Sequence, residues 1–272
     1  MTAFGLAESV RLARAALAGG SEVALGVVVG GPAELLGRRL AWDGERLHGS
    51  LGDPAADRAA GAALAAEEDG PGTVGVAGAG VELYVERVLA PPELVIVGAG
   101  HIAVPLAAIG ALLGWTVTVL DDRPEFARAE RFPDADRVIV ADFADPFAGI
   151  RVGPRTRLVL VTRGHRYDYD CLRALAEMQA EPAYVGMIGS RRRVRAAFEM
   201  LAGEGFDAER LARVRAPIGL DVEAQTPAEI AVAVAAEMIQ AERGGSGRPL
   251  RDVEDVVRYV KGLRPPAAEG PD

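Results

Sequence analysis

The sequence predicts an α/β protein with a C-terminal doubly wound parallel sheet and a smaller N-terminal α/β domain. After residue 92, short apolar runs alternate with stretches of helical periodicity. These runs lack polar alternation, which is typical of parallel strands covered by helices on both faces. Before Pro91-Pro92 the pattern instead contains a hairpin. We therefore expect a small domain at 1–90, the doubly wound domain at 93–243, and a C-terminal helix and tail at 244–272.

The small domain is expected to begin with a helix, because residues 5–18 carry apolar side chains at helical spacing and are followed by Gly20. Asp43-Gly44 predicts the turn of a hairpin. The other apolar runs and breakers predict a strand at 21–31, the hairpin at 38–52, an Ala-rich helix at 54–68 and one or two strands at 73–89.

The doubly wound domain ends with a strong helix signal. Thr226 suits the N-cap, Pro227 the first helical position and Glu229 the third. Strands are predicted at 93–98, 115–121, 136–142, 156–164 and 183–189, and helices up to 113, at about 167–179, after 189, at 227–243 and at 253–263. The last two helices carry apolar faces that would either cap the sheet or form a homodimer.

A glycine turn joins the first strand of this domain to its first helix. Gly98, Gly100 and Ala103 form the G-x-G-x-x-A pattern of a Rossmann-like dinucleotide-binding turn. Gly98 would permit the tight turn, and Gly100 would let the backbone approach a diphosphate. The free N–H groups at the helix start, around Ile102, would bind the phosphate. His101 is either an exposed loop residue or a hydrogen-bond donor to the ligand.

The next strand ends in acidic residues. Asp121 lies about 20 residues beyond the turn, where a carboxylate accepts hydrogen bonds from ribose hydroxyls. Asp122 adds negative charge, which disfavours a 2′-phosphate, while Arg123 would accommodate one. The pattern favours an NAD-like or adenosine-like ligand over NADP.

A second polar cluster follows the strand at 156–164. The carboxyl ends of parallel strands are where ligands bind in open α/β sheets, so we expect ligand contacts here. The alternative role for Asp168 is the N-cap of the following helix. The cluster comprises Thr162, Arg163, Gly164, His165 and Asp168.

A third segment, YVGMIGSRRRV, completes the predicted pocket. Gly189 would allow close backbone approach, and Ser190 suits the N-cap of the next helix. Three consecutive arginines spread around a helix, so only Arg191 or Arg192 would meet the ligand. The others should be exposed or paired with acids such as Glu199.

Composition excludes several function classes. A formal charge of −9 and a pI near 5.0 argue against non-specific binding to nucleic acid or anionic membranes. Cys171 is the single cysteine, which rules out an internal disulfide and a cysteine-based zinc site, and we expect it in the core. The first residues do not resemble a signal peptide, and no run of about 20 apolar residues occurs. We predict a cytoplasmic protein without metal ligands.

The motifs GAGHIA, DDR, RFPDAD, VTRGHRYDYDCL, AYVGMIGSRRRV and APIGLDVEAQTPAEIAVAVAAEMI occur in this order between residues 93 and 243. They resemble the xanthine dehydrogenase accessory factors, the XdhC/CoxI family. The resemblance implies a maturation factor for molybdenum hydroxylases such as xanthine or carbon monoxide dehydrogenase. Such a factor binds the molybdenum cofactor, as molybdopterin or its dinucleotide form. It protects the cofactor while a partner cysteine desulfurase supplies sulfur, and delivers it to the apo-enzyme.

The N-terminal part departs from the family. Related chains carry cysteines in the segments that correspond to GSLGDPAAD and VGVAGAGVELYVE, and neither segment has one here. We therefore expect no contact with molybdenum or sulfur from those positions. No catalytic residue is assigned. Two other interpretations stay open: an NAD(P)-dependent oxidoreductase, with a His/Asp pair available for acid–base work, and a nucleotide-sensing regulatory protein without chemistry.

Overall fold

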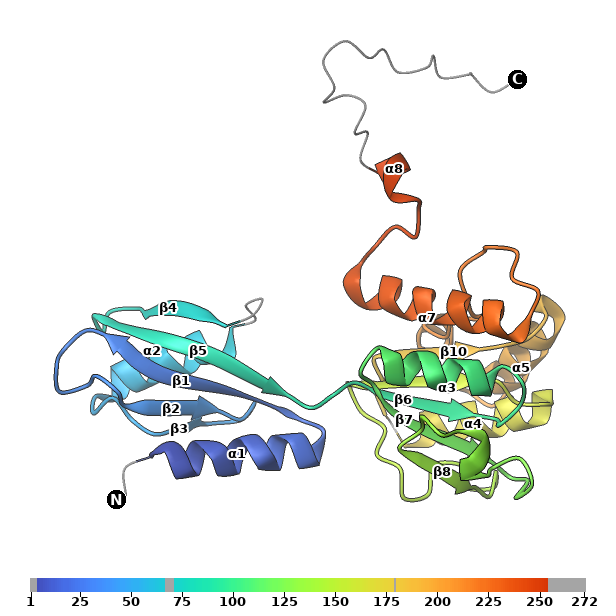
Figure 1. Cartoon of the computed structure of the whole chain (residues 1–272), viewed down its shortest axis with the longest axis horizontal. Helices are drawn as coiled ribbons and strands as arrows, with labels where there is room; N and C mark the ends of the chain where they lie inside the picture. The colour runs from blue at the N-terminus through green and yellow to red at the C-terminus, as the bar shows by residue number, and fades with distance from the viewer. Residues whose placement is uncertain (1–3, 67–70, 179, 254–272) are drawn as a thin grey trace, which may run out of the picture. The chain divides into compact units, whose positions relative to one another are not determined.

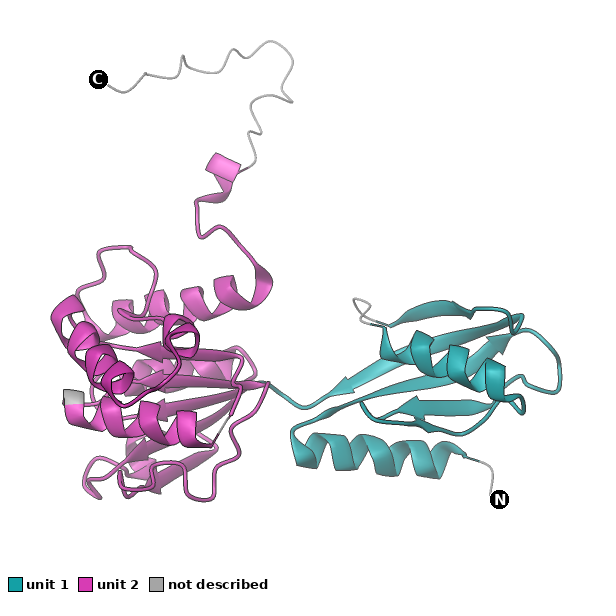
Figure 2. Cartoon of the chain, turned by 180° about the vertical axis from the view of Figure 1, so that it is seen from behind, with its two compact units in different colours: residues 1–92 teal, residues 93–272 magenta. Residues whose placement is uncertain are grey.

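The computed structural model describes residues 4–66, 71–178 and 180–253. The chain divides into two compact units, residues 1–92 and 93–272, next to the proline pair (Figure 2). The first unit contains a five-stranded sheet and the second a five-stranded parallel sheet, so the predicted α/β fold class is confirmed.

The first unit is an antiparallel sheet with one helix on each face. Alternate residues of its central strand point to opposite sides: Val23 packs with Ala16 of the first helix, whereas Ala24 and Val28 pack with Leu64 of the second. The strand order is β3-β2-β1-β5-β4. The elements are α1 (Leu6–Gly19), β1 (Glu22–Gly30), β2 (Arg39–Trp42), β3 (Leu47–His48), α2 (Pro54–Ala65), β4 (Gly72–Val76) and β5 (Val81–Leu89).

The second unit has the strand order β10-β9-β6-β7-β8 (Figure 1). The chain first builds outward from β6 in one direction and then crosses back to β9, so a topological switch point lies between β6 and β9. Ligands of doubly wound sheets bind in the crevice at this point. The strands are β6 (Glu93–Val97), β7 (Thr116–Asp121), β8 (Arg137–Val140), β9 (Thr156–Leu160) and β10 (Tyr184–Met187).

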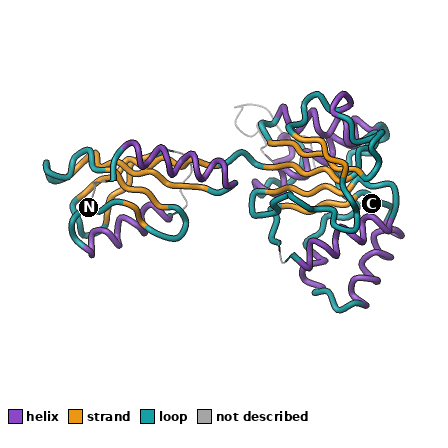
Figure 3. Tube along the Cα trace, turned by 90° about the horizontal axis from the view of Figure 1, so that it is seen from below, coloured by secondary structure: helices purple, strands orange, loops and turns teal. Residues whose placement is uncertain are grey.

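Helices cover both faces of this sheet (Figure 3). One core layer joins the sheet to α3 and α7, through residues such as Leu106 and Val234. The opposite layer joins it to α4 and α5, through residues such as Leu172 and Leu201. The helices are α3 (Ala103–Leu112), α4 (His165–Glu177), α5 (Arg191–Gly203), α6 (Ala208–Ala212), α7 (Pro227–Arg243) and α8 (Leu250–Val253), with a short 3₁₀ helix, η1 (Ala129–Arg131).

Most predicted elements are present, with shifted ends. The Thr226–Glu229 capping box forms and α7 caps the sheet, while a dimer through this helix stays a prediction. Helix α4 begins at His165, two residues before the predicted start, because Gly164 is its N-cap. The short elements η1 and α6 were not predicted. The predicted helix at 253–263 lies outside the described residues, apart from Val253.

Candidate functional site

The carboxyl ends of β6, β7 and β9 bring three of the predicted segments to one edge of the sheet. The backbone N–H of Gly98, after β6, donates to Leu120 of β7 at 2.7 Å. The backbone N–H of Val161, after β9, donates to Val97 of β6 at 2.8 Å. Gly98, Asp121, Thr162 and Arg163 line one small niche at this edge. The switch point therefore carries the residues that the sequence motifs single out.

The two glycines of the turn have different physical roles. Gly98 adopts a φ of +107°, and a Cβ atom there would lie 2.6 Å from the carbonyl oxygen of Val161, so the fold itself requires glycine. A Cβ atom on Gly100 would meet nothing within 4 Å. Packing does not explain glycine at position 100, whereas the close approach of a ligand would.

The start of α3 offers unused donors beside Gly100. The N-cap position, Ile102, supplies no side-chain cap. Within the described residues, the backbone N–H groups of Gly100, His101 and Ile102 have no hydrogen-bond acceptor. Together with the helix dipole, such groups form an anion-binding site. The His101 side chain is exposed, and its contact with a ligand stays a prediction.

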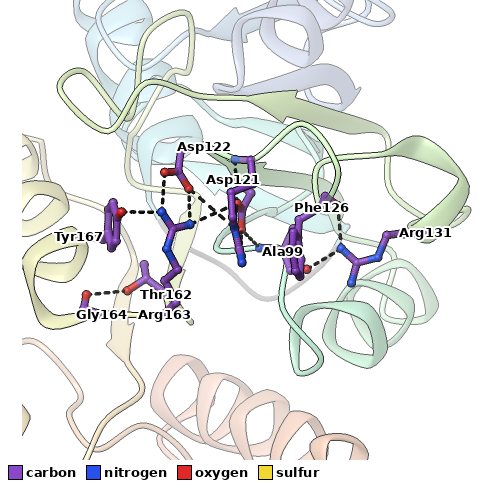
Figure 4. A network of polar contacts seen from close by, with 10 residues as sticks. Ala99, Asp121, Asp122, Phe126, Arg131, Thr162, Arg163, Gly164 and Tyr167 are labelled. Atoms are coloured by element: carbon purple, nitrogen blue, oxygen red, sulfur yellow. Dashed lines mark hydrogen bonds and ion pairs between the residues drawn. The ribbon is translucent and has the colours of Figure 1, made fainter.

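Asp121 is buried and holds the turn in place (Figure 4). One carboxylate oxygen accepts from the backbone N–H of Ala99 at 2.7 Å and from Nη2 of Arg123 at 2.9 Å. The other accepts from the backbone N–H and Nε of Arg123, at 3.0 and 2.8 Å. Burial raises the pKa of Asp121, but the bonds from Arg123 and Ala99 outweigh it and lower the pKa overall. A ribose contact by Asp121 stays a prediction, and it would require one of these bonds to be exchanged.

Arg163 closes the crevice above Gly98. Its guanidinium donates to both carboxylate oxygens of Asp122, at 2.6 and 2.8 Å, and to the hydroxyl of Tyr167 at 2.5 Å. The remaining space in the niche is about 10 Å³, roughly the room that one water needs. Figure 4 shows the Arg163 side chain between Asp122 and Tyr167. A phosphate group enters this niche only if the Arg163 side chain moves.

Arg131 supports the glycine turn from the opposite side, a role that the sequence patterns did not predict. It donates from Nη1 to the carbonyl oxygens of Ala99 and Phe126, both at 2.8 Å. The Phe126 ring also lies 3.5 Å from the guanidinium carbon of Arg123. Arg131 is the first residue of the RFPDAD motif. The motif therefore marked this residue, but its contact with the glycine turn is visible only in the structure.

A buried ion pair joins the second and third predicted segments. Arg193 of α5 donates from Nε to Asp168 at 2.7 Å and from Nη2 to the same carboxylate. The Thr162 hydroxyl lies 2.5 Å from the other oxygen of Asp168 and accepts from Arg193 at 3.1 Å. Asp168 is fully buried within α4, so its alternative role as N-cap is wrong. Its contact with a ligand stays a prediction.

The arginine segment behaves in part as expected. Ser190 is the N-cap of α5 and accepts from the backbone N–H of Arg193 at 3.4 Å. Arg191 is exposed at the start of the helix, where a ligand contact stays a prediction. Arg195 pairs with Glu199 at 2.7 Å. A Cβ atom on Gly189 would lie 3.2 Å from Cδ of Arg193, so this glycine makes room for the inward-turned arginine.

The APIGLD segment is tied to the rest of the domain by a buried acid. Glu237 of α7 accepts from the hydroxyl of Tyr184 at 2.8 Å and from the backbone N–H of Gly219 at 2.7 Å. A Cβ atom on Gly186 would lie 2.2 Å from Cδ1 of Ile218, so the segment also packs directly on β10. The segment therefore supports the sheet edge beside the candidate site.

His165 and Cys171 both belong to α4. His165 is the first residue of α4, and its side chain lies outside the described part of the structure. Cys171 is fully buried, as predicted. Burial, and then the charges of Asp168 and Asp170, raise the pKa of its thiol far above the usual range. Across the described residues, no group of three His, Cys, Asp or Glu side chains could hold a metal ion.

Comparison with known proteins agrees with this geometry. Residues 94–238 match the family model of the XdhC Rossmann domain. A probable xanthine dehydrogenase subunit of Bacillus subtilis (strain 168) is 30% identical over 161 residues, which cover 59% of this chain and 46% of that protein. The uncharacterised YqeB of Escherichia coli (strain K12) is 32% identical over 157 residues, covering 57% and 28%. The chain thus spans less than half the length of these curated relatives.

Among solved structures, a xanthine dehydrogenase from Bacillus halodurans has a TM-score of 0.64 at 22% identity, covering 89% of this chain and 69% of that one. This likeness shows a shared fold. Among the described residues, no helix is long and apolar enough to cross a membrane. Because the family model spans more than half of the chain, the protein belongs to the XdhC family of xanthine dehydrogenase accessory factors.

Proposed function

We propose that the protein is a cytoplasmic maturation factor that binds molybdenum cofactor and delivers it to a molybdenum hydroxylase of the xanthine or carbon monoxide dehydrogenase type. Membership of the XdhC family and the Bacillus subtilis relative, a probable xanthine dehydrogenase subunit, support the proposal. The cofactor, molybdopterin or its dinucleotide form, carries a phosphate on a pterin, and phosphate is the group that the glycine turn would receive.

The observation that carries the proposal is the open space at Gly100. A side chain would fit there without a clash, so packing does not require glycine, and the close approach of a ligand to the backbone would explain it. The N–H groups at the start of α3 would hold the phosphate. Arg163 would leave Asp122 and pair with the phosphate oxygens, because a guanidinium binds phosphate through parallel hydrogen bonds.

Delivery of sulfur is assigned to a partner. The bound cofactor supplies the molybdenum centre, and this chain would hold its organic part. Cys171 is buried and its raised pKa keeps it as a thiol, so it is neither a molybdenum ligand nor a sulfur carrier. A cysteine desulfurase would therefore bring the sulfur to the bound cofactor, and the hydroxylase apo-enzyme would receive the product.

Titration of the purified full chain with molybdopterin, NAD, NADP and cytidine nucleotides tests the proposal. We expect molybdopterin to bind more tightly than either nicotinamide dinucleotide. We further expect the loaded chain to activate an apo-hydroxylase of this type. Micromolar NAD binding without pterin binding would overturn the proposal. Turnover of NADH with a carbonyl substrate would favour an oxidoreductase instead.

A further inference from the structure

A second, larger cavity lies beside the glycine turn at the same edge of the sheet. Its volume is about 510 Å³, within the range of small-molecule sites and sufficient for a bicyclic base with a ribose. Asp122 follows β7, and Asp142 and Phe143 follow β8. The remaining wall is α4, from Arg166 to Arg173. The lining residues are Asp122, Asp142, Phe143, Ala144, Arg166, Tyr167, Asp170 and Arg173, and we call this cavity the α4 groove.

The α4 groove and the niche above Gly98 share Asp122, Phe143 and Tyr167. The Arg163 side chain bridges two of these shared residues, since it pairs with Asp122 and donates to the Tyr167 hydroxyl. Its guanidinium also lies 4.4 Å from the centre of the Tyr167 ring. Arg163 lines the niche and contacts two residues of the wall that both spaces share. The shared residues place the two spaces next to each other at this edge of the sheet.

The α4 groove combines an aromatic wall with acids and arginines. The rings of Phe143 and Tyr167 lie 5.0 Å apart at 59° and give the groove an aromatic wall. Arg166, Asp170 and Arg173 recur at spacings of four and three residues, so they share one face of α4. Within the described residues, the Asp170 carboxylate makes no hydrogen bond or ion pair, although it is half-buried.

This chemistry selects one class of heterocycle. A carboxylate accepts two parallel bonds from a ring that carries an amino group next to a ring N–H, and a guanidinium donates to the neighbouring carbonyl oxygen. The 2-amino-4-oxo ring of guanine and pterins offers this arrangement. Adenine does not, because the ring nitrogen beside its amino group is an acceptor.

We propose that the α4 groove binds the 2-amino-4-oxo heterocycle of the ligand whose phosphate occupies the glycine turn. Asp170 accepts from the amino group and ring N–H, and Arg173 or Arg166 donates to the oxo group. Phe143 and Tyr167 pack against the ring. The inference rests on the proposed function in one respect, because it requires a phosphate at the glycine turn.

Calorimetric titration of the full chain with guanosine 5′-diphosphate, adenosine 5′-diphosphate, ribose 5-phosphate and a phosphorylated pterin tests the groove. We expect the guanine and pterin compounds to bind at least about tenfold more tightly than the other two, about 1.4 kcal/mol. Asp170→Asn should abolish this preference and leave ribose 5-phosphate binding unchanged. Glu199→Gln, which removes one exposed carboxylate from α5, is the matched control and should keep the preference. The order of the guanine and pterin affinities identifies the heterocycle.

Three results would overturn the assignment of the α4 groove as a heterocycle site. Equal affinity of the chain for all four compounds would contradict this assignment and leave the phosphate site and the proposed function in place. If Asp170→Asn melts at the wild-type temperature but binds all four compounds more weakly by the same factor, Asp170 acts on phosphate binding and not on the heterocycle. Failure of every phosphate compound and of molybdopterin to bind would overturn both the groove and the proposed function.

Discussion

Asp122 holds the guanidinium of Arg163 through both carboxylate oxygens, at 2.6 and 2.8 Å, and both residues line the niche above Gly98. The Asp122 carboxylate therefore accepts the hydrogen bonds that Arg163 would otherwise donate to a ligand phosphate. Binding of a phosphate and pairing with Asp122 compete for the same donors.

Asp122→Asn is expected to raise the affinity for phosphate-bearing ligands. The amide keeps the size of the side chain but removes the negative charge that competes for Arg163. Because this pair is partly exposed, we expect a gain of about 1 kcal/mol at most, or about fivefold in affinity. Calorimetry at fixed ionic strength measures it, with Asp145→Asn, after β8, as the control. Weaker binding by Asp122→Asn would mean that Asp122 contacts the ligand itself.

Substitutions of Gly98 and Gly100 should differ in their effect on the free energy of unfolding. Gly98→Ala forces a side chain into a left-handed conformation and against the backbone of Val161, so we expect a loss of about 2 kcal/mol or more. The methyl group that Gly100→Ala adds would point into open space, so this substitution should change the free energy of unfolding by about 0.5 kcal/mol or less. Urea unfolding of both variants gives the comparison. Equal destabilisation by the two variants would contradict the distinction between a structural and a ligand-facing glycine.

Arg193→Ala should destabilise the second unit strongly. It removes the arginine that pairs with the fully buried Asp168, and losing one member of a buried ion pair costs about 3–5 kcal/mol. The Thr162 hydroxyl still donates to Asp168 in the variant, so we expect the lower end of this range. Arg192→Ala, at the exposed neighbouring position, is the control and should cost about 0.5 kcal/mol or less. Thermal and urea unfolding measure both. A small effect of Arg193→Ala, or full recovery in Arg193→Met without a change at Asp168, would show that the pair contributes little.

Cys171 should be unreactive in the folded protein. Its thiol is fully buried, and burial together with nearby acidic groups raises its pKa, so thiolate is scarce at neutral pH. We expect iodoacetamide to label it slowly in buffer and quickly in urea, measured by mass spectrometry. Stoichiometric labelling of the folded chain within minutes would contradict the assignment of sulfur transfer to a partner.

The fold could be predicted from the sequence because its signals are local. The apolar runs, the glycine turn and the capping box at Thr226 each act within a few residues. The contacts that organise the site are long-range. Arg131 reaches Ala99 across 32 positions, and Arg193 reaches Asp168 across 25. No periodicity connects such pairs, so their partners emerge only when the strands are ordered in the sheet.

The three consecutive arginines of α5 differ in how they lie relative to the buried face of the helix. The buried positions of α5 are Val194, Ala197 and Leu201. Arg193 lies one turn before Ala197 and so borders this face, whereas Arg191 and Arg192 point to solvent. The apolar stripe thus indicates which arginine turns inward. Its partner, a buried carboxylate one helix earlier, could not be read from the stripe.

We propose that the glycine turn binds molybdenum cofactor through its phosphate. Titration of molybdopterin into the wild-type chain and into Gly100→Asp tests it most directly, because the new carboxylate places negative charge where the phosphate would lie. We predict saturable binding to the wild type and no measurable binding to the variant, with both chains melting at the same temperature. Unchanged affinity in Gly100→Asp would contradict the account and leave the turn a purely structural feature.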